Sequence, residues 1–106
     1  MAREYTVDGE LFTTQKALPE RLRSILYSYH DGEAVSHEDM RFLYSLVDNY
    51  HPSSELKIGV GVARIEVRQN PQYRNNRGFW IVRTDGTDTD FSFMECLRPS
   101  SQLDKF

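Results

Sequence analysis

Three aspartates lie close together in the second half of the chain, at positions 85, 88 and 90. Neighbouring carboxylates can hold a hard divalent cation, and such an ion can assist phosphodiester cleavage. Asp85, Asp88 and Asp90 lack the spacing and the glutamate of a calcium loop, and aspartate is common in turns because it hydrogen-bonds to the local backbone. A metal-dependent nuclease is therefore kept as an alternative, and no metal site or cofactor is predicted.

The histidines and the cysteine do not form a recognisable catalytic set. His30, His37 and His51 are scattered without the paired spacing of a metal site, and no nucleophile motif surrounds them. A histidine near a helix end can complement the helix dipole. Cys96 is the only cysteine, and we interpret it as a small buried hydrophobic residue. The sequence thus predicts a binding module and not an enzyme.

A third group combines basic and aromatic side chains. Residues 57–83 hold six basic residues and one acid, Glu66, whereas residues 1–56 hold five basic and ten acidic residues. Cations contact phosphates, while rings and guanidinium groups stack on unpaired bases, which is how small sheets read single-stranded RNA. The predicted nucleic-acid-binding residues are Lys57, Arg64, Arg68, Tyr73, Arg74, Arg77, Trp80 and Arg83. The alternative is that Trp80 and Phe79 belong to the core and that the arginines only solvate the sheet and protect its edge.

Two amphipathic helices are predicted before this basic segment. The apolar residues of the first recur every three or four positions, at Leu18, Leu22, Ile25, Leu26 and Tyr29. Those of the second follow the same period, at Met40, Leu43, Leu46, Val47 and Tyr50. We expect the first helix to end at His30-Asp31-Gly32, and the second to begin after an N-cap at Ser36 and to end before Pro52.

From Ile58 onward the pattern changes to that of strands. Ile58, Val60 and Val62 alternate with small residues, and after Ala63 the apolar positions change parity. Two explanations remain open: a bulge near Ala63 reverses the faces, or the start of the strand is buried on both sides.

The second half of the sheet is predicted from turn and strand signals. Residues 69–78 have the composition of a loop, and residues 79–83 form the second strand. Asp85-Gly86 indicates a hairpin whose two central residues both take positive φ. Phe91 and Phe93 would then lie on one face of the third strand.

Length and composition fit one domain. A chain of 106 residues with 39% hydrophobic residues can bury a single core. We expect an α+β fold in which two N-terminal antiparallel helices pack on one face of a small antiparallel sheet of three or more strands. The core is expected over about residues 14–98, with residues 1–12 and 99–106 flexible.

The chain carries no recognisable targeting signal. Its N-terminus has neither an apolar signal core nor transit-peptide character, and its apolar stretches are too short for a membrane span. We therefore expect a soluble protein of the cytoplasm with no membrane partner. A plastid or nuclear location is the alternative if the chain is a fragment of a plant protein.

One set of residues forms an ordered pattern: His51-Pro52, Lys57-Ile58-Gly59, Gly61, Ile65, Val67, Pro71, Tyr73, Phe79, Arg83, Asp85-Gly86, Asp90-Phe91-Ser92 and Cys96. Leu26, Asp39 and Phe42-Leu43 fit upstream. In this order the residues resemble the DeCL (defective chloroplasts and leaves) domain, a domain of unknown function, over about residues 16–98. Two positions depart from it: Gly78 stands where a cysteine or small polar residue is expected, and Glu95 where a lysine is expected.

The resemblance implies a role in RNA metabolism. The family is known from plant plastid proteins associated with ribosomal RNA processing, from the tail of the largest subunit of plant RNA polymerase V, and from stand-alone microbial proteins. It supplies no catalytic residue, and the pattern positions of unknown role are His51, Asp85, Asp90 and Ser92. By resemblance the chain is an accessory module that binds RNA or an RNP, with docking to a polymerase or ribosomal protein as the alternative.

Overall fold

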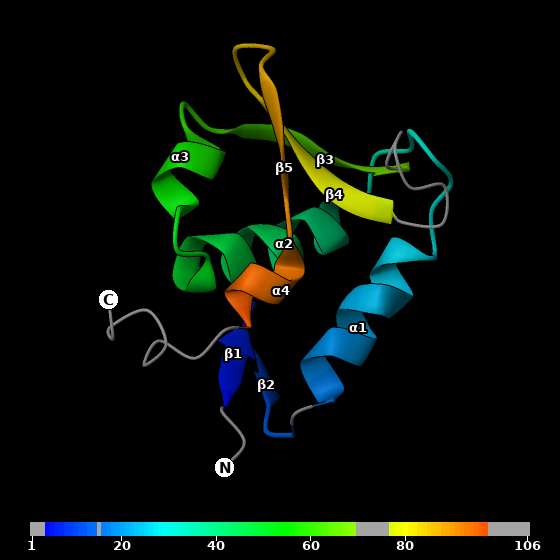
Figure 1. Cartoon of the computed structure of the whole chain (residues 1–106), viewed down its shortest axis with the longest axis vertical. Coiled ribbons are helices and arrows are strands. Elements are labelled where there is room, and N and C mark those ends of the chain that lie inside the picture. Colours follow the sequence, from blue (N-terminus) through cyan, green and yellow to red (C-terminus); the bar gives the residue numbers. More distant parts are fainter. Residues whose placement is uncertain (1–3, 15, 70–76, 98–106) are drawn as a thin grey trace.

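The computed structural model describes residues 4–14, 16–69 and 77–97, and it confirms a mixed α+β domain with antiparallel sheets (Figure 1). The elements are β1 (Tyr5–Val7), β2 (Glu10–Phe12), α1 (Ala17–Leu26), α2 (His37–Tyr50), α3 (Ser54–Ile58), β3 (Val62–Gln69), β4 (Arg77–Arg83), β5 (Asp88–Phe91) and α4 (Phe93–Cys96). Strands β1 and β2 form one sheet, and β3, β4 and β5 form a second sheet in that order. Among the described residues, no helix has the length and apolar character needed to cross a membrane.

The first sheet is a hairpin in a segment where we expected a flexible end. Val7 pairs with Glu10, so Asp8-Gly9 is a two-residue loop, and both residues have positive φ, 48° and 84°. This is the backbone that a tight hairpin turn of type I′ requires, and Asp-Gly is a favoured sequence for it. The inward side chains of the hairpin, Tyr5, Val7 and Phe12, are buried in the core.

Both long helices bury the apolar faces that the sequence predicts. In α1 the buried residues are Leu18, Leu22, Ile25 and Leu26. In α2 they are Phe42, Leu43, Leu46 and Val47. Helix α2 has the predicted N-cap, since the Ser36 hydroxyl accepts a hydrogen bond from the Asp39 amide at 3.2 Å.

The connection between α1 and α2 pairs with the edge of the sheet. Helix α1 ends at Leu26, earlier than expected, and the Gly32 amide donates to the Val67 carbonyl at 2.7 Å. The Val67 amide donates to the Glu33 carbonyl at 2.9 Å. The connection therefore covers the outer edge of β3, which would otherwise present unpaired backbone groups. The expected N-terminal helical pair packed on the sheet is not confirmed, because strands come first.

Strand β3 begins later than the alternation of Ile58, Val60 and Val62 predicted. Ile58 ends the short helix α3, and the strand begins at Val62. The register between β3 and β4 shifts between Val62 and Arg64. Of the two explanations left open by the sequence, the bulge at Ala63 is therefore confirmed, and it turns Ile65 toward the core.

The β4–β5 hairpin also differs in detail from its prediction. Its connection is longer than two residues, since the Arg83 amide donates to the Thr87 carbonyl at 2.7 Å. Only Gly86 has positive φ there, and Asp85 does not. Phe93 lies in α4 and not in β5, because the strand stops at Phe91.

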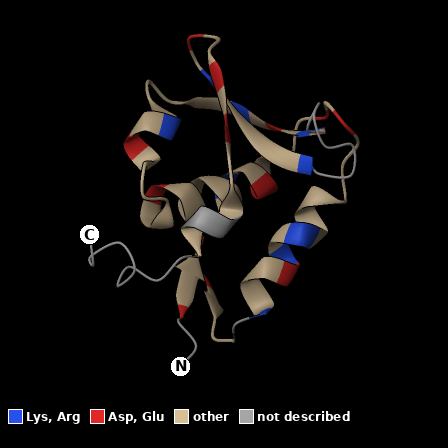
Figure 2. Cartoon of the chain, in the orientation of Figure 1, with Lys and Arg blue, Asp and Glu red and all other residues tan. Residues whose placement is uncertain are grey.

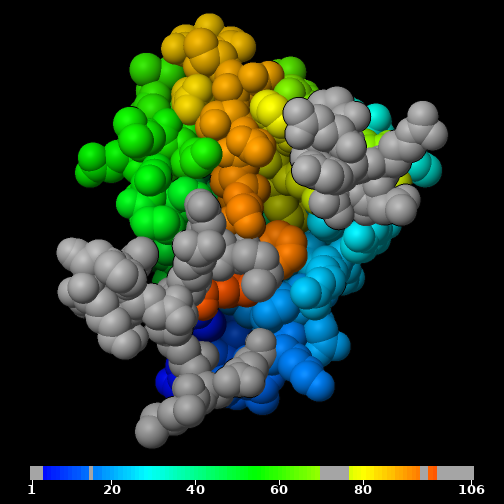
Figure 3. Space-filling model, in the orientation of Figure 1, coloured from blue at the N-terminus to red at the C-terminus, as the bar shows by residue number. Residues whose placement is uncertain are grey.

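The three-stranded sheet has two different faces. The covered face contributes Ile65, Val67, Phe79, Ile81 and Phe91 to the core that it shares with the helices and the N-terminal hairpin. Alternation places the partner residues of the opposite face on the other side of the sheet. We call this side the open face, and its residues are Arg64, Glu66, Arg68, Trp80, Val82, Asp88 and Asp90. In the space-filling view β5 lies at the surface between α3 and β4 (Figure 3).

Candidate functional site

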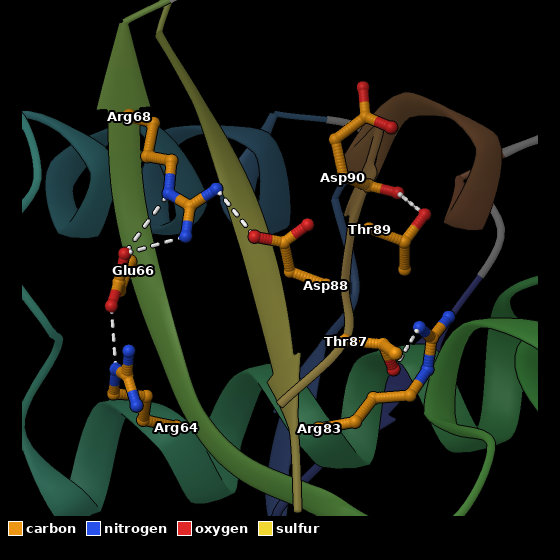
Figure 4. Close-up of polar contacts among 8 residues, drawn as sticks. All are labelled: Arg64, Glu66, Arg68, Arg83, Thr87, Asp88, Thr89 and Asp90. Carbon is orange, nitrogen blue, oxygen red and sulfur yellow. Dashed lines mark hydrogen bonds and ion pairs between the residues drawn. The ribbon is translucent and has the colours of Figure 1, made fainter. Parts of the chain in front are cut away.

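The open face carries a ladder of alternating charges. Arg64 Nε donates to Glu66 Oε2 at 2.5 Å, and Arg68 Nε donates to Glu66 Oε1 at 3.0 Å. Arg68 also reaches across β4 to β5, where its Nη1 lies 3.0 Å from Asp88 Oδ2 (Figure 4). Residues two apart on one strand share a face, so Glu66 lies between both arginines. The ladder therefore contains two positive and two negative groups and has no net charge.

Trp80 is half-buried on the same face, under one of these arginines. It is paired with Glu66 of β3 on one side and with Asp90 of β5 on the other. The Arg68 guanidinium carbon lies 4.8 Å from the centre of the Trp80 ring system, within the range of a cation–π contact. Of the predicted aromatic and basic residues, Arg68 and Trp80 contact each other on this face.

Glu66 is held ionised by its two arginine neighbours. Partial burial would raise the pKa of its carboxyl group, but hydrogen bonds and charge attraction from Arg64 and Arg68 outweigh burial and lower the pKa below its ordinary value of 4.5. Because the folded-state pKa is depressed, this stabilisation is present above the unfolded-state pKa and is lost as pH falls through the folded-state pKa.

We expect Glu66→Gln to flatten the acid side of the stability profile. The wild-type free energy of unfolding should fall more than that of the variant as pH drops from 6 to below 4, since only the wild type must protonate this carboxylate. Urea denaturation across that range measures the difference. Glu20→Gln on α1 is the matched control, and equal slopes for wild type and Glu66→Gln would contradict the prediction.

Arg83 and Lys57 are on the covered side and tie α3 to the hairpin. Arg83 Nε donates to the Lys57 carbonyl at 3.1 Å, and its Nη2 donates to the Leu56 carbonyl at 2.9 Å. These carbonyls belong to the last turn of α3, whose carbonyls lack intrahelical partners. Lys57 Nζ in turn donates to the Asp90 carbonyl at 2.7 Å. Both cations are therefore used to hold backbone in place.

Arg77 has a similar role at the other end of β4. Its Nη1 donates to the Tyr29 carbonyl at 2.5 Å, and its guanidinium carbon lies 5.7 Å from the centre of the Tyr27 ring. The charges seen over the whole fold are interspersed along the sheet (Figure 2). Of the eight predicted nucleic-acid-binding residues, Arg64, Arg68 and Trp80 share the open face, whereas Lys57, Arg77 and Arg83 contact backbone near helix ends. The predicted positions Tyr73 and Arg74 lie outside the described residues.

The family-pattern positions of unknown role differ in their surroundings. His51 is buried as the C-cap of α2, where its Nδ1 accepts from the Ser53 amide at 2.9 Å and its ring stands edge-on to Phe91 with centres 6.5 Å apart. The Asp85 carboxylate accepts from the amide and hydroxyl of Thr87, and these bonds lower the pKa of Asp85. Ser92 is exposed between β5 and α4.

The aspartates of the hairpin are not gathered around a common point. Asp88 pairs with Arg68 and Asp85 with Thr87, while the carbonyl of Asp90 accepts from Lys57. Within the described part of the chain, no group of three or more His, Cys, Asp or Glu residues is placed to hold a metal ion. Cys96 is buried in the core.

One surface feature was missed in the sequence, a groove on the outer side of α2. Its volume is about 470 Å³, and it is lined by Asp8, Met40, Arg41, Tyr44, Ser45, Asp48, Asn49 and Val62. The signal in the sequence was Tyr44, a large aromatic residue on the polar face of α2. It is 40% exposed.

Comparison with known proteins connects this fold to a family. Residues 23–97 match the model described as "Protein of unknown function (DUF3223)". The chain is 34% identical over 92 residues to DNA-directed RNA polymerase V subunit 1 of Arabidopsis thaliana, covering 85% of this chain and 5% of that protein. It is 38% identical over 79 residues to Protein DCL, chloroplastic, of Solanum lycopersicum, covering 73% of this chain and 35% of that protein.

A solved structure shares the fold over almost its whole length. The solution NMR structure of an uncharacterized protein from Rhodospirillum rubrum superimposes with a TM-score of 0.81 and 32% identity, over 91% of this chain and 89% of that one. The chain spans about a third or less of the two plant relatives named above. From the family match and these relatives, the chain belongs to the DUF3223 family, the DeCL-type domain whose residue pattern it carries.

Proposed function

We propose that this chain is an accessory domain that docks onto a protein partner in an RNA-synthesising or RNA-handling assembly. The observation that carries the proposal is the pairing of Arg64 and Arg68 with Glu66 and Asp88. A face that binds nucleic acid electrostatically needs surplus positive charge, and the ladder has none. Balanced, alternating charges instead suit a protein surface of matching pattern.

The names of the relatives support the proposal that the partner belongs to an RNA-synthesising assembly. Segments similar to this chain make up 5% and 6% of the subunits named DNA-directed RNA polymerase V subunit 1 and DNA-directed RNA polymerase IV subunit 1. Two other relatives have the word chloroplastic in their names, and a cytoplasmic location for this chain is likewise a proposal.

A capture experiment tests the docking proposal. Tagged chain is incubated with extract of its own source cells, with and without RNase and DNase, and the retained proteins are identified by mass spectrometry. We expect polymerase or RNP proteins to be retained equally in both samples. Loss of all retained proteins after nuclease treatment would mean that nucleic acid, and not protein, is bound.

RNA binding is the second candidate, and the co-location of Arg64, Arg68 and Trp80 on the open face favours it. Rings and guanidinium groups are the platforms on which unpaired bases stack. Phosphates would have to compete with Glu66 and Asp88 for the two arginines. Tyr73 and Arg74, with Lys57, Arg77 and Arg83, complete the proposed RNA-contacting set.

Competition between RNA phosphates and the two carboxylates allows RNA binding to be distinguished from protein docking. Fluorescence anisotropy is measured with single-stranded RNA, duplex RNA and single-stranded DNA at two salt concentrations. If RNA binds here, Glu66→Gln/Asp88→Asn should tighten it by releasing the arginines, and Arg64→Ala/Arg68→Ala should weaken it. The logarithm of the affinity should also fall by about 0.7 per logarithm of salt for each single-strand contact. Under the docking proposal none of the variants binds RNA, and Arg23→Ala on α1 serves as the charge control.

A further inference from the structure

The groove on α2 has an apolar floor that is partly open to solvent. Met40 and Val62 are half-buried, and Tyr44, which lines the groove with them, is 40% exposed. Its walls come from three parts of the chain: α2, the turn of the N-terminal hairpin at Asp8, and the start of β3 at Val62. A concave apolar surface framed by polar residues is typical of sites that receive a partner's side chain.

Hydrogen bonds fix the wall that the hairpin contributes. The Ser45 hydroxyl accepts from the Asp8 amide at 3.0 Å. Asn49 Nδ2 donates to the Ser45 carbonyl at 2.9 Å, and Arg41 lies 3.7 Å from the Asp8 carboxylate. Because the hairpin turn is bonded to α2 in this way, the groove exists before any partner arrives, which lowers the cost of binding.

The rim of the groove is acidic. Asp8 is partly neutralised by Arg41. Asp48 has no ion pair or hydrogen bond from its carboxylate among the described residues. The lining therefore holds two carboxylates and one guanidinium group, and this net negative charge favours cationic side chains over phosphates.

We propose that this groove binds a short basic segment of a protein partner, with one apolar or aromatic side chain on Tyr44 and a flanking Lys or Arg side chain at Asp48. This inference rests on the proposed docking function, and it adds to the open face a second contact surface, on α2, with a stated partner chemistry. Charge complementarity selects the occupant, because the rim is negative. A second copy of this chain fits less well, since the described arginines of its sheet already have carboxylate, carbonyl or ring partners.

The direct test is an NMR titration of the ¹⁵N-labelled full chain. The probe is a heptapeptide with one tryptophan between two Lys-Arg pairs, and the control peptide has glutamate in place of every basic residue. We expect amide shifts at Tyr44, Ser45, Asp48 and Val62 with the basic peptide alone. No shifts at millimolar basic peptide, equal shifts with the acidic peptide, or shifts elsewhere on the fold would overturn the proposal.

Substitutions test whether the peptide that causes these amide shifts is bound in the groove. Tyr44→Ala should weaken binding about tenfold, as expected for removal of a central aromatic contact, and Asp48→Lys should weaken it further and remove its dependence on salt. The matched controls are Leu11→Ala, an apolar residue 61% exposed on β2, and Glu20→Lys on α1. Both controls should bind as wild type does, and equal loss in a control would overturn the assignment to this groove.

The two proposals fail separately. If the nuclease-resistant partners are still retained by Tyr44→Ala/Asp48→Lys, docking stands and this groove is not its surface. If wild type retains no protein yet binds the basic peptide at α2, the groove stands and the proposed function fails. Shifts that change with protein concentration in the absence of peptide would identify a second copy as the occupant and overturn the proposal.

Discussion

A chain that begins at residue 14 will lose most or all of its folding stability. The deletion removes the N-terminal hairpin, whose Tyr5, Val7 and Phe12 are 8%, 0% and 8% exposed in the folded chain. Loss of a large buried apolar side chain costs about 2–5 kcal/mol, and a domain of this size is stable by only about 5–15 kcal/mol. The loss of the two aromatic side chains, with the smaller loss of Val7, approaches the whole stability. Urea denaturation followed by the fluorescence of Trp80, the only tryptophan, measures the effect.

Point variants in the full chain separate packing from chain length. Val7→Ala should lower the free energy of unfolding by about 1–2 kcal/mol, because it leaves a cavity under the hairpin. Leu11→Ala, on the exposed side of the same hairpin, should change it by less than about 0.5 kcal/mol. An unchanged urea midpoint in the shortened chain would show that the hairpin is not part of the cooperative unit.

Burial of the N-terminal hairpin also indicates where the domain begins. The family match covers residues 23–97, which leaves out the hairpin together with Leu18 and Leu22, both fully buried. The matched segment is therefore the recognisable part of the fold and lacks part of the core. The Rhodospirillum rubrum structure, which superimposes on 91% of this chain, covers more of the fold than the matched segment does.

The sequence predicted what depends on local periodicity and failed where contacts between distant segments decide. The helical period located α1 and α2, the cap at Ser36 was correct, and the change of parity at Ala63 did mark a bulge. The five residues of α3 are too few to show a helical period. The alternation of Ile58, Val60 and Val62 therefore suggested a strand where the chain turns.

The basic segment, residues 57–83, also depends on contacts between distant parts of the chain. Counting charges correctly found a surplus of arginine around Glu66, but not how the arginines are used. Arg68 meets Asp88 only because β4 and β5 are in a particular register. Arg77 and Arg83 find their carbonyl partners 48 and 26–27 residues away along the chain. No local pattern contains that information, so the sequence could not show that carboxylates balance the arginines of the ladder.

Gly59→Ala should destabilise the domain by about 3 kcal/mol. Gly59 ends α3 with φ 56° and ψ −124°, a backbone conformation that is essentially reserved for glycine and costs other residues about 1–3 kcal/mol. An added Cβ would also lie 2.9 Å from both Cδ and Nε of Arg83. That side chain cannot move aside freely, because its guanidinium group is bonded to the carbonyls of Leu56 and Lys57.

Variants at two other glycines separate the cost of Gly59→Ala into backbone strain and steric clash. Gly32 has φ +84°, and no atom of the described part of the chain lies within 4 Å of its Cβ position, so Gly32→Ala should cost only the backbone strain, about 1–2 kcal/mol. Gly78 does not have positive φ, and among the described residues no atom lies within 4 Å of its Cβ position, so Gly78→Ala should be close to neutral. In an Arg83→Ala background the clash is absent, so the cost of Gly59→Ala should fall toward that of Gly32→Ala. If the Gly59→Ala cost is the same with and without Arg83, the contact between these two residues does not determine how α3 is seated on the hairpin.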